Sequence, residues 1–296
     1  MLSLNAHTGA VVALTFSPDS QYLATSGKDG MIRLWEPPFE RFAVSVGGTG
    51  TVLSSMIFTP KGDQLIGGTD RGAIQFRDLS GTILREIPGG RDSTSITGLR
   101  FMPGSPLLIV ATGRKAMKVI GGIHYVPMVE RASTPIPIRD GSGIWSIDDH
   151  PAKRFLAWSN GNREIRIKNM LSPDDPLLFR PGVDVPSIAI SPEGTHLAAA
   201  ADWAVRIYDI AKKTERFKLT GHKGTVSSVA YLPNGRAILS GSGDKTVKMW
   251  DSATGRDIVT LTFPMGRVTC LAVAPDGLRA AVGDDQGNIT LWDLDS

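Results

Sequence analysis

Short apolar or alternating segments, separated by turn residues, recur along this 296-residue chain. Residues 226–230 and 246–250 are examples, and their frequent β-branched side chains are typical of strands. No helical period extends over a useful length of the sequence. The pattern therefore predicts an all-β protein built from many short strands.

A turn rich in Pro, Gly and Asn follows the first strand of each repeated segment. Pro fixes φ at such a turn, and Gly or Asn supplies positive φ, so these are tight hairpin connections. The turns are Ser17-Pro18-Asp19, Thr59-Pro60-Lys61-Gly62, Met102-Pro103-Gly104, His150-Pro151, Ser191-Pro192-Glu193-Gly194, Pro233-Asn234-Gly235 and Pro275-Asp276-Gly277. Their regular recurrence indicates an internal repeat.

A set of four polar and aromatic residues recurs at fixed offsets in two distant parts of the chain. In each set a His is followed by Thr or Ser at plus 18, Asp at plus 22 and Trp at plus 28. The two sets are His7, Thr25, Asp29 and Trp35, and His222, Ser240, Asp244 and Trp250. Identical offsets more than 200 residues apart indicate that both segments belong to one kind of repeating unit.

The segment 221–251 begins with Gly-His and ends with Trp-Asp, and it closely resembles a WD-repeat, the unit of a β-propeller blade. Sliding this template along the chain gives seven units, whose steps of about 41 to 48 residues suit one four-stranded blade each. The Trp position is assigned to Trp35, Phe76, Val119 or Ile120, Ile167, Tyr208, Trp250 and Trp292. The resemblance implies a single domain over residues 1–296, a seven-bladed propeller of four-stranded antiparallel blades, with units at 5–41, 42–86, 87–135, 136–178, 179–219, 220–261 and 262–296 plus 1–4.

The two ends of the chain predict how the ring closes. The last unit ends at Trp292-Asp293, in its third strand, so its fourth strand is missing. Residues 2–4 stand directly before His7, as residues 217–219 stand before His222. We expect the N-terminal strand to complete the last blade, which removes two exposed strand edges.

Composition narrows the class of protein. The net charge is +3, from 32 basic and 29 acidic residues, which does not by itself favour nucleic acid. A single cysteine, Cys270, excludes an internal disulfide and suits a reducing compartment, so we expect a cytoplasmic protein with a buried, inert thiol. No apolar run approaches 18 residues and no signal peptide is apparent, so no membrane association is expected.

The His, Thr and Asp of the first set have the residue types of a nucleophilic triad, but the family resemblance implies a hydrogen-bond chain inside a blade. Buried polar groups between sheets need such partners. The histidines show no metal-ligand spacing, and residues 47–50 lack the lysine and helix of a phosphate-binding loop. Carboxylate pairs such as Asp148-Asp149 are adjacent in sequence, and the channel positions show no clustered titratable groups. We therefore expect no enzyme, no cofactor and no metal.

The remaining candidate is one rim of the propeller, where the inner strands begin and the hairpins between second and third strands turn. The positions that face inward there are Val12, Ser54, Thr97, Trp145, Pro186, Ser227 and Thr269. Most are small, so Trp145 suggests an interaction anchor, although it could instead pack on Pro186 or Pro151 as core. Trp203 is a second candidate, because it occupies a hairpin tip where a solvated residue is usual.

Basic residues are also expected on this rim. They are Lys28, Arg71, Arg114, Lys115, Arg163, Lys223, Lys245 and Arg267, interrupted by Asp92, Asp184 and Asp285. Solubility alone would explain polar hairpin tips. The sharper hypothesis is an acidic segment or phosphopeptide held across the rim by the basic residues and tryptophans.

The sequence thus predicts a non-catalytic scaffold, monomeric by itself, that binds a protein or peptide on the rim, including Ser227. Fold alone does not determine function, so two alternatives stay open. One is a regulatory or sensor propeller within a larger protein such as a kinase, protease or ATPase. The other is a propeller that binds nucleic acid through basic rim residues.

Overall fold

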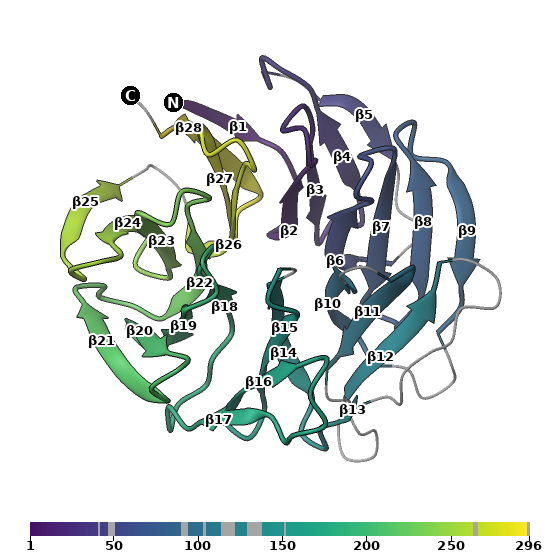
Figure 1. Cartoon of the computed structure of the whole chain (residues 1–296). Coiled ribbons are helices and arrows are strands. Elements are labelled where there is room, and N and C mark those ends of the chain that lie inside the picture. Colours follow the sequence, from purple (N-terminus) through teal and green to yellow (C-terminus); the bar gives the residue numbers. More distant parts are fainter. Residues whose placement is uncertain are drawn as a thin grey trace.

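Seven four-stranded antiparallel sheets are arranged in a ring around a central channel (Figure 1). The computed structural model describes residues 1–40, 42–46, 51–89, 94–102, 105–113, 122–128, 138–150, 152–262 and 266–294. Within each blade consecutive strands pair as neighbours, and the first strand is innermost. The fold is therefore the seven-bladed β-propeller that the repeat pattern predicted.

The strands of the first four blades follow the chain in order. Blade one contains β2 (Val11–Phe16), β3 (Leu23–Gly27), β4 (Ile32–Trp35) and β5 (Phe42–Val46). Blade two contains β6 (Leu53–Phe58), β7 (Gln64–Thr69), β8 (Ile74–Asp78) and β9 (Ile83–Ile87). Blade three contains β10 (Ile96–Phe101), β11 (Leu107–Thr112), β12 (Gly122–Pro127) and β13 (Ile138–Arg139). Blade four contains β14 (Ile144–His150), β15 (Phe155–Asn160), β16 (Ile165–Asn169) and β17 (Leu177–Phe179).

The last three blades complete the ring. Blade five contains β18 (Ile188–Ile190), β19 (His196–Ala201), β20 (Ala204–Asp209) and β21 (Thr214–Thr220). Blade six contains β22 (Val226–Tyr231), β23 (Ala237–Ser242), β24 (Thr246–Asp251) and β25 (Asp257–Thr262). Blade seven contains β26 (Val268–Val273), β27 (Arg279–Asp284), β28 (Asn288–Asp293) and, from the other end of the chain, β1 (Leu2–Asn5).

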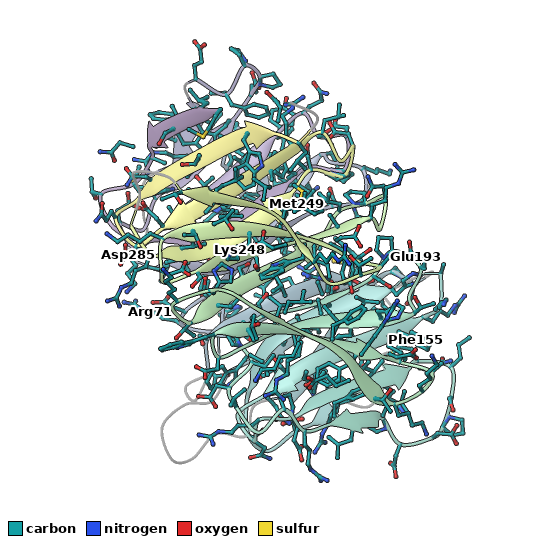
Figure 2. The ribbon with its side chains drawn as sticks, turned by 90° about the vertical axis from the view of Figure 1, so that its left-hand side faces the viewer. Arg71, Phe155, Glu193, Lys248, Met249 and Asp285 are labelled. Atoms are coloured by element: carbon teal, nitrogen blue, oxygen red, sulfur yellow. The ribbon has the colours of Figure 1, made fainter. Side chains whose placement is uncertain are left out.

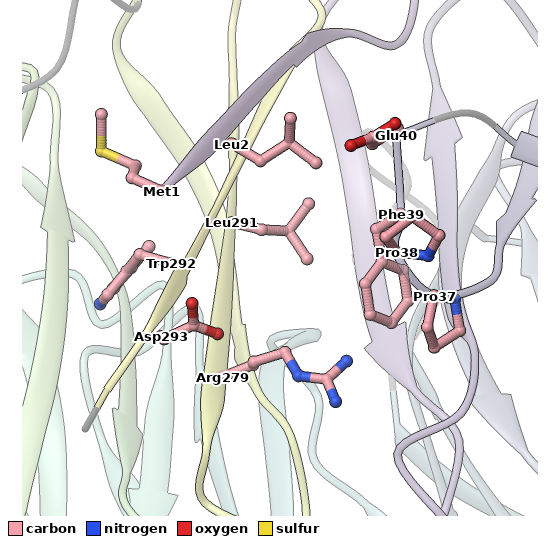
Figure 3. Close-up of a pocket in the computed structure, with 10 residues that line it drawn as sticks. All are labelled: Met1, Leu2, Pro37, Pro38, Phe39, Glu40, Arg279, Leu291, Trp292 and Asp293. Carbon is pink, nitrogen blue, oxygen red and sulfur yellow. The ribbon is translucent and has the colours of Figure 1, made fainter. Parts of the chain in front are cut away.

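The pairing of β1 with β28 confirms the predicted ring closure. Leu2 faces Leu291 and Asn5 faces Asn288 in an antiparallel ladder. At the outer seam between blades seven and one, the Arg279 guanidinium carbon lies 5.1 Å from the centre of the Phe39 ring (Figure 3). Figure 3 also shows Leu2 and Leu291 side by side at this seam, next to a cavity of about 470 Å³.

Apolar side chains fill the spaces between neighbouring blades. Between blades five and six, for example, Val205 and Leu219 form one cluster with Val229, Ile238 and Trp250. All five are almost fully buried. Each blade therefore buries its faces against its two neighbours, as expected for a ring of sheets.

Strand register corrects the alignment of the Trp position in blades two to four. In blades one and six the Trp faces the first or second residue of the second strand, as Trp35 faces Leu23 and Trp250 faces Ile238. By the same register the position is Arg77 in blade two, Val126 in blade three and Lys168 in blade four. Phe76 and Ile167 were therefore wrong by one residue, which turns a side chain to the opposite face of its sheet. Val119 and Ile120 lie outside the described residues.

Candidate interaction rim and the polar networks behind it

Blade six holds the four residues of its set, His222, Ser240, Asp244 and Trp250, in one chain of hydrogen bonds. The Trp250 indole N–H donates to Ser240 Oγ at 2.8 Å, and His222 Nε2 lies 2.8 Å from the same oxygen. His222 Nδ1 lies 3.0 Å from Asp244 Oδ2. The Ser240 hydroxyl accepts from Trp250 and donates to His222 Nε2, so the histidine is the neutral tautomer with its proton on Nδ1. That Nδ1–H then donates to Asp244, and every polar group of the set has a partner.

Blade one repeats this arrangement with a threonine. Trp35 Nε1 donates to Thr25 Oγ1 at 3.0 Å, and His7 Nε2 lies 3.0 Å from that hydroxyl. His7 Nδ1 lies 3.0 Å from Asp29 Oδ1. The structure thus brings together all four residues of each sequence-derived set.

Burial and hydrogen bonding set the protonation of these networks. Burial lowers the pKa of His222, although its hydrogen bond to Asp244 opposes the shift. Burial alone would raise the pKa of Asp244, but hydrogen bonds from Thr246, the Lys223 amide and His222 outweigh it and lower the pKa to about 2. Because Ser240 is fully buried, no substrate can reach its hydroxyl, and the network is suited to a structural role.

Blade four has a network that sequence comparison missed. Asp140 stands four residues before β14, where His222 stands before β22, and its side chain is fully buried. Trp158 Nε1 donates to Asp140 Oδ2 at 2.9 Å, and Asn160 Nδ2 donates to Asp140 Oδ1 at 2.9 Å. The Arg166 guanidinium lies 3.7 Å from the same carboxylate. The only sequence signal for it was an Asp at the His position of an otherwise atypical unit.

The channel lining also differs from expectation, because titratable groups do cluster there. Arg100 and Asp148 both line the channel and lie 3.2 Å apart, and Arg100 Nε lies 3.4 Å from Asp149 Oδ1. The expectation of no clustered titratable groups was therefore wrong, since one guanidinium joins two adjacent carboxylates from the neighbouring blade. Burial raises the pKa of Asp149 to about 6; Arg100 opposes that shift and Asp148 adds to it.

Cys270 has the chemistry of an inert thiol. Burial raises its pKa to about 12, so sulfur is protonated at neutral pH and is a poor nucleophile. Groups of three or more His, Cys, Asp or Glu suited to holding a metal are not found among the described residues. Nor do those residues include a helix of the length and apolar character needed to cross a membrane.

The rim carries a ring of seven equivalent positions at the start of the inner strands. Six of them, Val12, Ser54, Thr97, Trp145, Ser227 and Thr269, coincide with β-bulges between first and second strands. The seventh, Pro186, lies two residues before β18. A bulge re-aims the side chain at its extra residue, so these positions are presented at the mouth of the channel.

Two hollows lie side by side on this rim and share Pro186. The first, here the Trp203 hollow, has a volume of about 720 Å³ and is lined by Pro186, Trp203, Lys223, Gly224, Thr225, Ser227, Gly243, Arg267, Val268, Thr269 and Asp285. The second, the Trp145 hollow, has a volume of about 500 Å³ and is lined by Ser95, Thr97, Gly113, Ser142, Ile144, Trp145, Gly161 and Pro186. Trp203 is 57% exposed and Trp145 is 38% exposed. Both tryptophans thus offer indole surface beside a concave site.

The other sequence-derived rim residues lie outside these hollows. Lys28, Arg71 and Lys245 are exposed at hairpin tips. Arg163 forms an ion pair with Asp184 at 3.2 Å, with both side chains more than half exposed. In the side view of Figure 2, Arg71 and Asp285 lie on one side of the molecule, and Phe155 and Glu193 lie on the other. Arg114 and Lys115, like Asp92 and residues 47–50, are not among the described residues.

Hydroxyl groups tie most neighbouring blades together just below the rim. In blades two, six and seven the bulge hydroxyl donates to a carbonyl at the start of the next inner strand: Ser54 to Ile96, Ser227 to Val268 and Thr269 to Val11, at 2.6–2.7 Å. In blades one and four a second-strand serine does the same: Ser26 to Leu53 and Ser159 to Val185, both at 2.7 Å.

Blades three and five lack this link within the described part of the chain. Thr97 Oγ1 is buried without a hydrogen-bond partner, and Pro186 has no hydroxyl. Ala111 and Ala200 occupy the second-strand positions that Ser26 and Ser159 hold elsewhere. The Trp145 hollow reaches from blade three across blade four to Pro186 of blade five, and the Trp203 hollow reaches from blade five across blade six to Arg267 and Thr269 of blade seven. Each hollow therefore includes one seam without the hydroxyl link and one seam that has it.

A closed ring of seven four-stranded blades, with His–Ser/Thr–Asp–Trp networks in blades one and six, defines the chain as a β-propeller. It belongs to the WD-repeat family. The family model for the WD domain, G-beta repeat, matches residues 1–36, 181–209, 213–251 and 255–293, which cover blades one, five, six and seven. Proteins of this family typically act as protein-interaction scaffolds, and they are generally non-catalytic.

Several named proteins are similar to this chain. Human striatin-4 is 23% identical over 264 residues, which cover 81% of this chain and 34% of striatin-4. Bovine pre-mRNA-processing factor 19 is 23% identical over 241 residues, covering 81% of this chain and 47% of that protein. The serine-threonine kinase receptor-associated protein of Dictyostelium discoideum is 22% identical over 255 residues, covering 81% of this chain and 79% of that protein. The chain thus spans a third to a half of the length of the first two relatives.

Proposed function

We propose that this chain is a non-catalytic scaffold that binds a protein or peptide partner on the rim, in the sector of Trp145 and Trp203. The observation that carries this proposal is the pair of exposed tryptophans flanking two adjoining hollows. Large aromatic side chains provide most of the binding energy at many interfaces, and exposing two of them otherwise favours aggregation.

The contacts between neighbouring blades support the same sector of the rim as the binding site. Where a hydroxyl links two blades, the carbonyl of the next inner strand is already satisfied. Among the described residues that link is missing at the seams of blades three and four and of blades five and six, and each of these seams lies within one of the hollows. A bound segment could fill these hollows and supply a polar partner to Thr97 Oγ1, which has none among the described residues.

The test is quantitative capture of proteins from a lysate of the source cells by wild type and by a Trp145→Ala/Trp203→Ala variant. Partners of the rim should be retained by wild type and lost by the variant. A Leu84→Ala/Ile258→Ala variant is the matched control, because it removes two exposed apolar side chains from outer strands β9 and β25. Equal recovery by all three proteins of matched melting temperature would contradict the rim as the site.

A second candidate is a propeller that regulates or senses for a larger protein. It is supported by the lengths of striatin-4 and pre-mRNA-processing factor 19, which extend well beyond their matched segments. An immunoblot of the source cells with an antibody against this chain tests it. A band near 31.7 kDa only would count against this candidate.

A further inference from the structure

We propose that the partner is an extended peptide segment carrying an anionic side chain, which binds in the Trp203 hollow between Lys223 and Arg267. An uncharged neighbouring residue of the same segment lies in the Trp145 hollow. This inference rests on the proposed rim function and adds the chemistry of the partner.

The Trp203 hollow offers two cations that have no ion-pair partner among the described residues. Lys223 and Arg267 line it, and neither side chain forms an ion pair with any residue that the structure describes. The single carboxylate there, Asp285, already accepts the Arg267 backbone N–H at 2.8 Å. An anionic side chain would gain charge-assisted hydrogen bonds from Lys223 and Arg267.

Arg163 shows that not every rim cation is available in this way. Its guanidinium lies 3.2 Å from Asp184, and it lines neither hollow. The anion site is therefore restricted to the side of the rim formed by blades six and seven, and is not a property of basic rim residues in general.

The Trp145 hollow has the opposite character, since none of the described residues that line it is charged. Its polar groups are hydroxyls, and one of them, Thr97 Oγ1, is buried without a partner although its equivalents in three other blades are bonded. Because Thr97 lines the hollow, a bound residue could supply the partner that this oxygen lacks. The site is suited to an apolar or small polar residue whose backbone meets that hydroxyl.

The two hollows share Pro186, so a single extended segment can cross from one to the other. The small number of cations, together with Asp285 beside them, distinguishes this surface from the basic stripe that a nucleic-acid backbone requires. Charge and shape therefore favour a peptide with one anionic residue.

Three pools of synthetic peptides would test the inference on the immobilised full chain. Each pool has mixed flanking residues and either glutamate, phosphoserine or serine fixed at the centre. We expect the glutamate or the phosphoserine pool to be retained above the serine pool, and the difference between these two identifies the anion. Peptides enriched from the retained pool are then labelled for fluorescence anisotropy.

Charge reversal locates the anion. Arg267→Glu and Lys223→Glu should each weaken binding of the enriched peptide by about tenfold or more, because each removes a charge-assisted hydrogen bond. Arg236→Glu makes the same charge change on the opposite rim and Arg163→Glu makes it at a paired cation, and both should leave the affinity unchanged. Trp145→Ala should alter the preferred flanking residues but keep the requirement for the anion.

The outcomes separate this inference from the proposed rim function. If the serine pool is retained as well as the others and is lost with Trp203→Ala, the partner does not need an anionic residue, and the proposed rim function stands. If retention survives both tryptophan substitutions and both charge reversals, both proposals are wrong. Two further results would contradict a peptide as the partner. One is that no pool is retained, and the other is that mixed-sequence single-stranded DNA binds more tightly, with a steep salt dependence.

Discussion

Blades six and four each provide an acceptor for a buried indole N–H, but with different residues at equivalent positions. In blade six a Trp on the third strand donates to Ser240 on the second strand, and His222 completes the chain. In blade four the second-strand position holds Trp158 itself, and the His position holds its acceptor, Asp140.

The comparison shows that the buried donor must be satisfied, whereas the residue that satisfies it can vary. An indole N–H buried between sheets costs free energy if it lacks an acceptor, and either a hydroxyl or a carboxylate can serve. A sequence template therefore identifies blade six and misses blade four, although both hold their strands by a buried indole hydrogen bond.

The largest expected effect comes from removing the centre of the blade-four network. Asp140→Ala leaves the Trp158 indole and the Asn160 amide without their acceptor, and should lower the free energy of unfolding by about 3 kcal/mol. Urea denaturation measures the loss. Asp175→Ala removes an exposed carboxylate from the same blade and is the control. A loss no larger than the control's would mean that the blade-four network is not a substitute for the blade-six network.

The blade-six counterpart should be weaker, because water can partly solvate the carboxylate that is left behind. His222→Ala leaves Ser240 and Asp244 without their hydrogen-bond partner. It should lower the free energy of unfolding by about 1–3 kcal/mol in the same assay. His124→Ala, which removes an exposed histidine, should cost far less. A His222→Ala variant as stable as wild type would show that the histidine does not contribute to the free energy of unfolding through this network.

The two blades should also respond to pH with opposite signs. The pKa of Asp149 is raised to about 6 by burial, against about 3.9 in an unfolded chain, so its contribution falls as pH rises between these values. The pKa of His222 is lowered by burial, so the contribution of His222 to the free energy of unfolding falls as pH drops below about 6.5.

Substitution separates the two responses. Relative to wild type, Asp149→Asn should gain about 1 kcal/mol of stability between about pH 4 and pH 7, since the ionised carboxyl is then absent. The His222→Ala variant should lose less stability than wild type on acidification over the same range. Unfolding curves at four pH values check both, and parallel curves for Asp149→Asn and wild type would show that Asp149 is not perturbed.

The smallest effect concerns the unlinked seams. Ala200→Ser introduces a hydroxyl in blade five at the position from which Ser26 and Ser159 link neighbouring blades. One new hydrogen bond should raise the free energy of unfolding by about 0.5 kcal/mol, measured as a small increase in Tm. The opposite change, Ser159→Ala, should lower it by about 1 kcal/mol. Destabilisation by Ala200→Ser would mean that this seam cannot accept the link.

The fold could be predicted because its markers are local. The seven units followed from sliding the repeat template along the chain, and the Pro-containing turns recur even in units without a Trp. The rim positions followed from their offset to the His position, and six of them coincide with bulges, such as Ser54 and Ser227. The ring closure followed from the similarity of residues 2–4 and 217–219, and β1 indeed pairs with β28.

The networks of the atypical blades could not be predicted, because their partners are set by register. Phe76 was assigned to the Trp position of blade two, yet register places Arg77 there, and Arg77 is buried and donates to the Gly81 carbonyl at 2.7 Å. The contact of Arg100 with Asp148 joins two blades across 48 positions of sequence, and its contact with Asp149 joins the same two blades, which no local pattern encodes. Exposure of Trp145 and Trp203 likewise depends on how neighbouring blades pack.

The pairing of β1 with β28 has a mechanical consequence. The ladder is antiparallel and joins four residue pairs, and the N- and C-terminal ends leave it next to each other (Figure 1). Tension applied between these two ends would load the backbone hydrogen bonds of the ladder one after another, as in unzipping, instead of all together in shear. The ring therefore has a defined weak point under force, at which β1 would peel away while the other six blades remained intact.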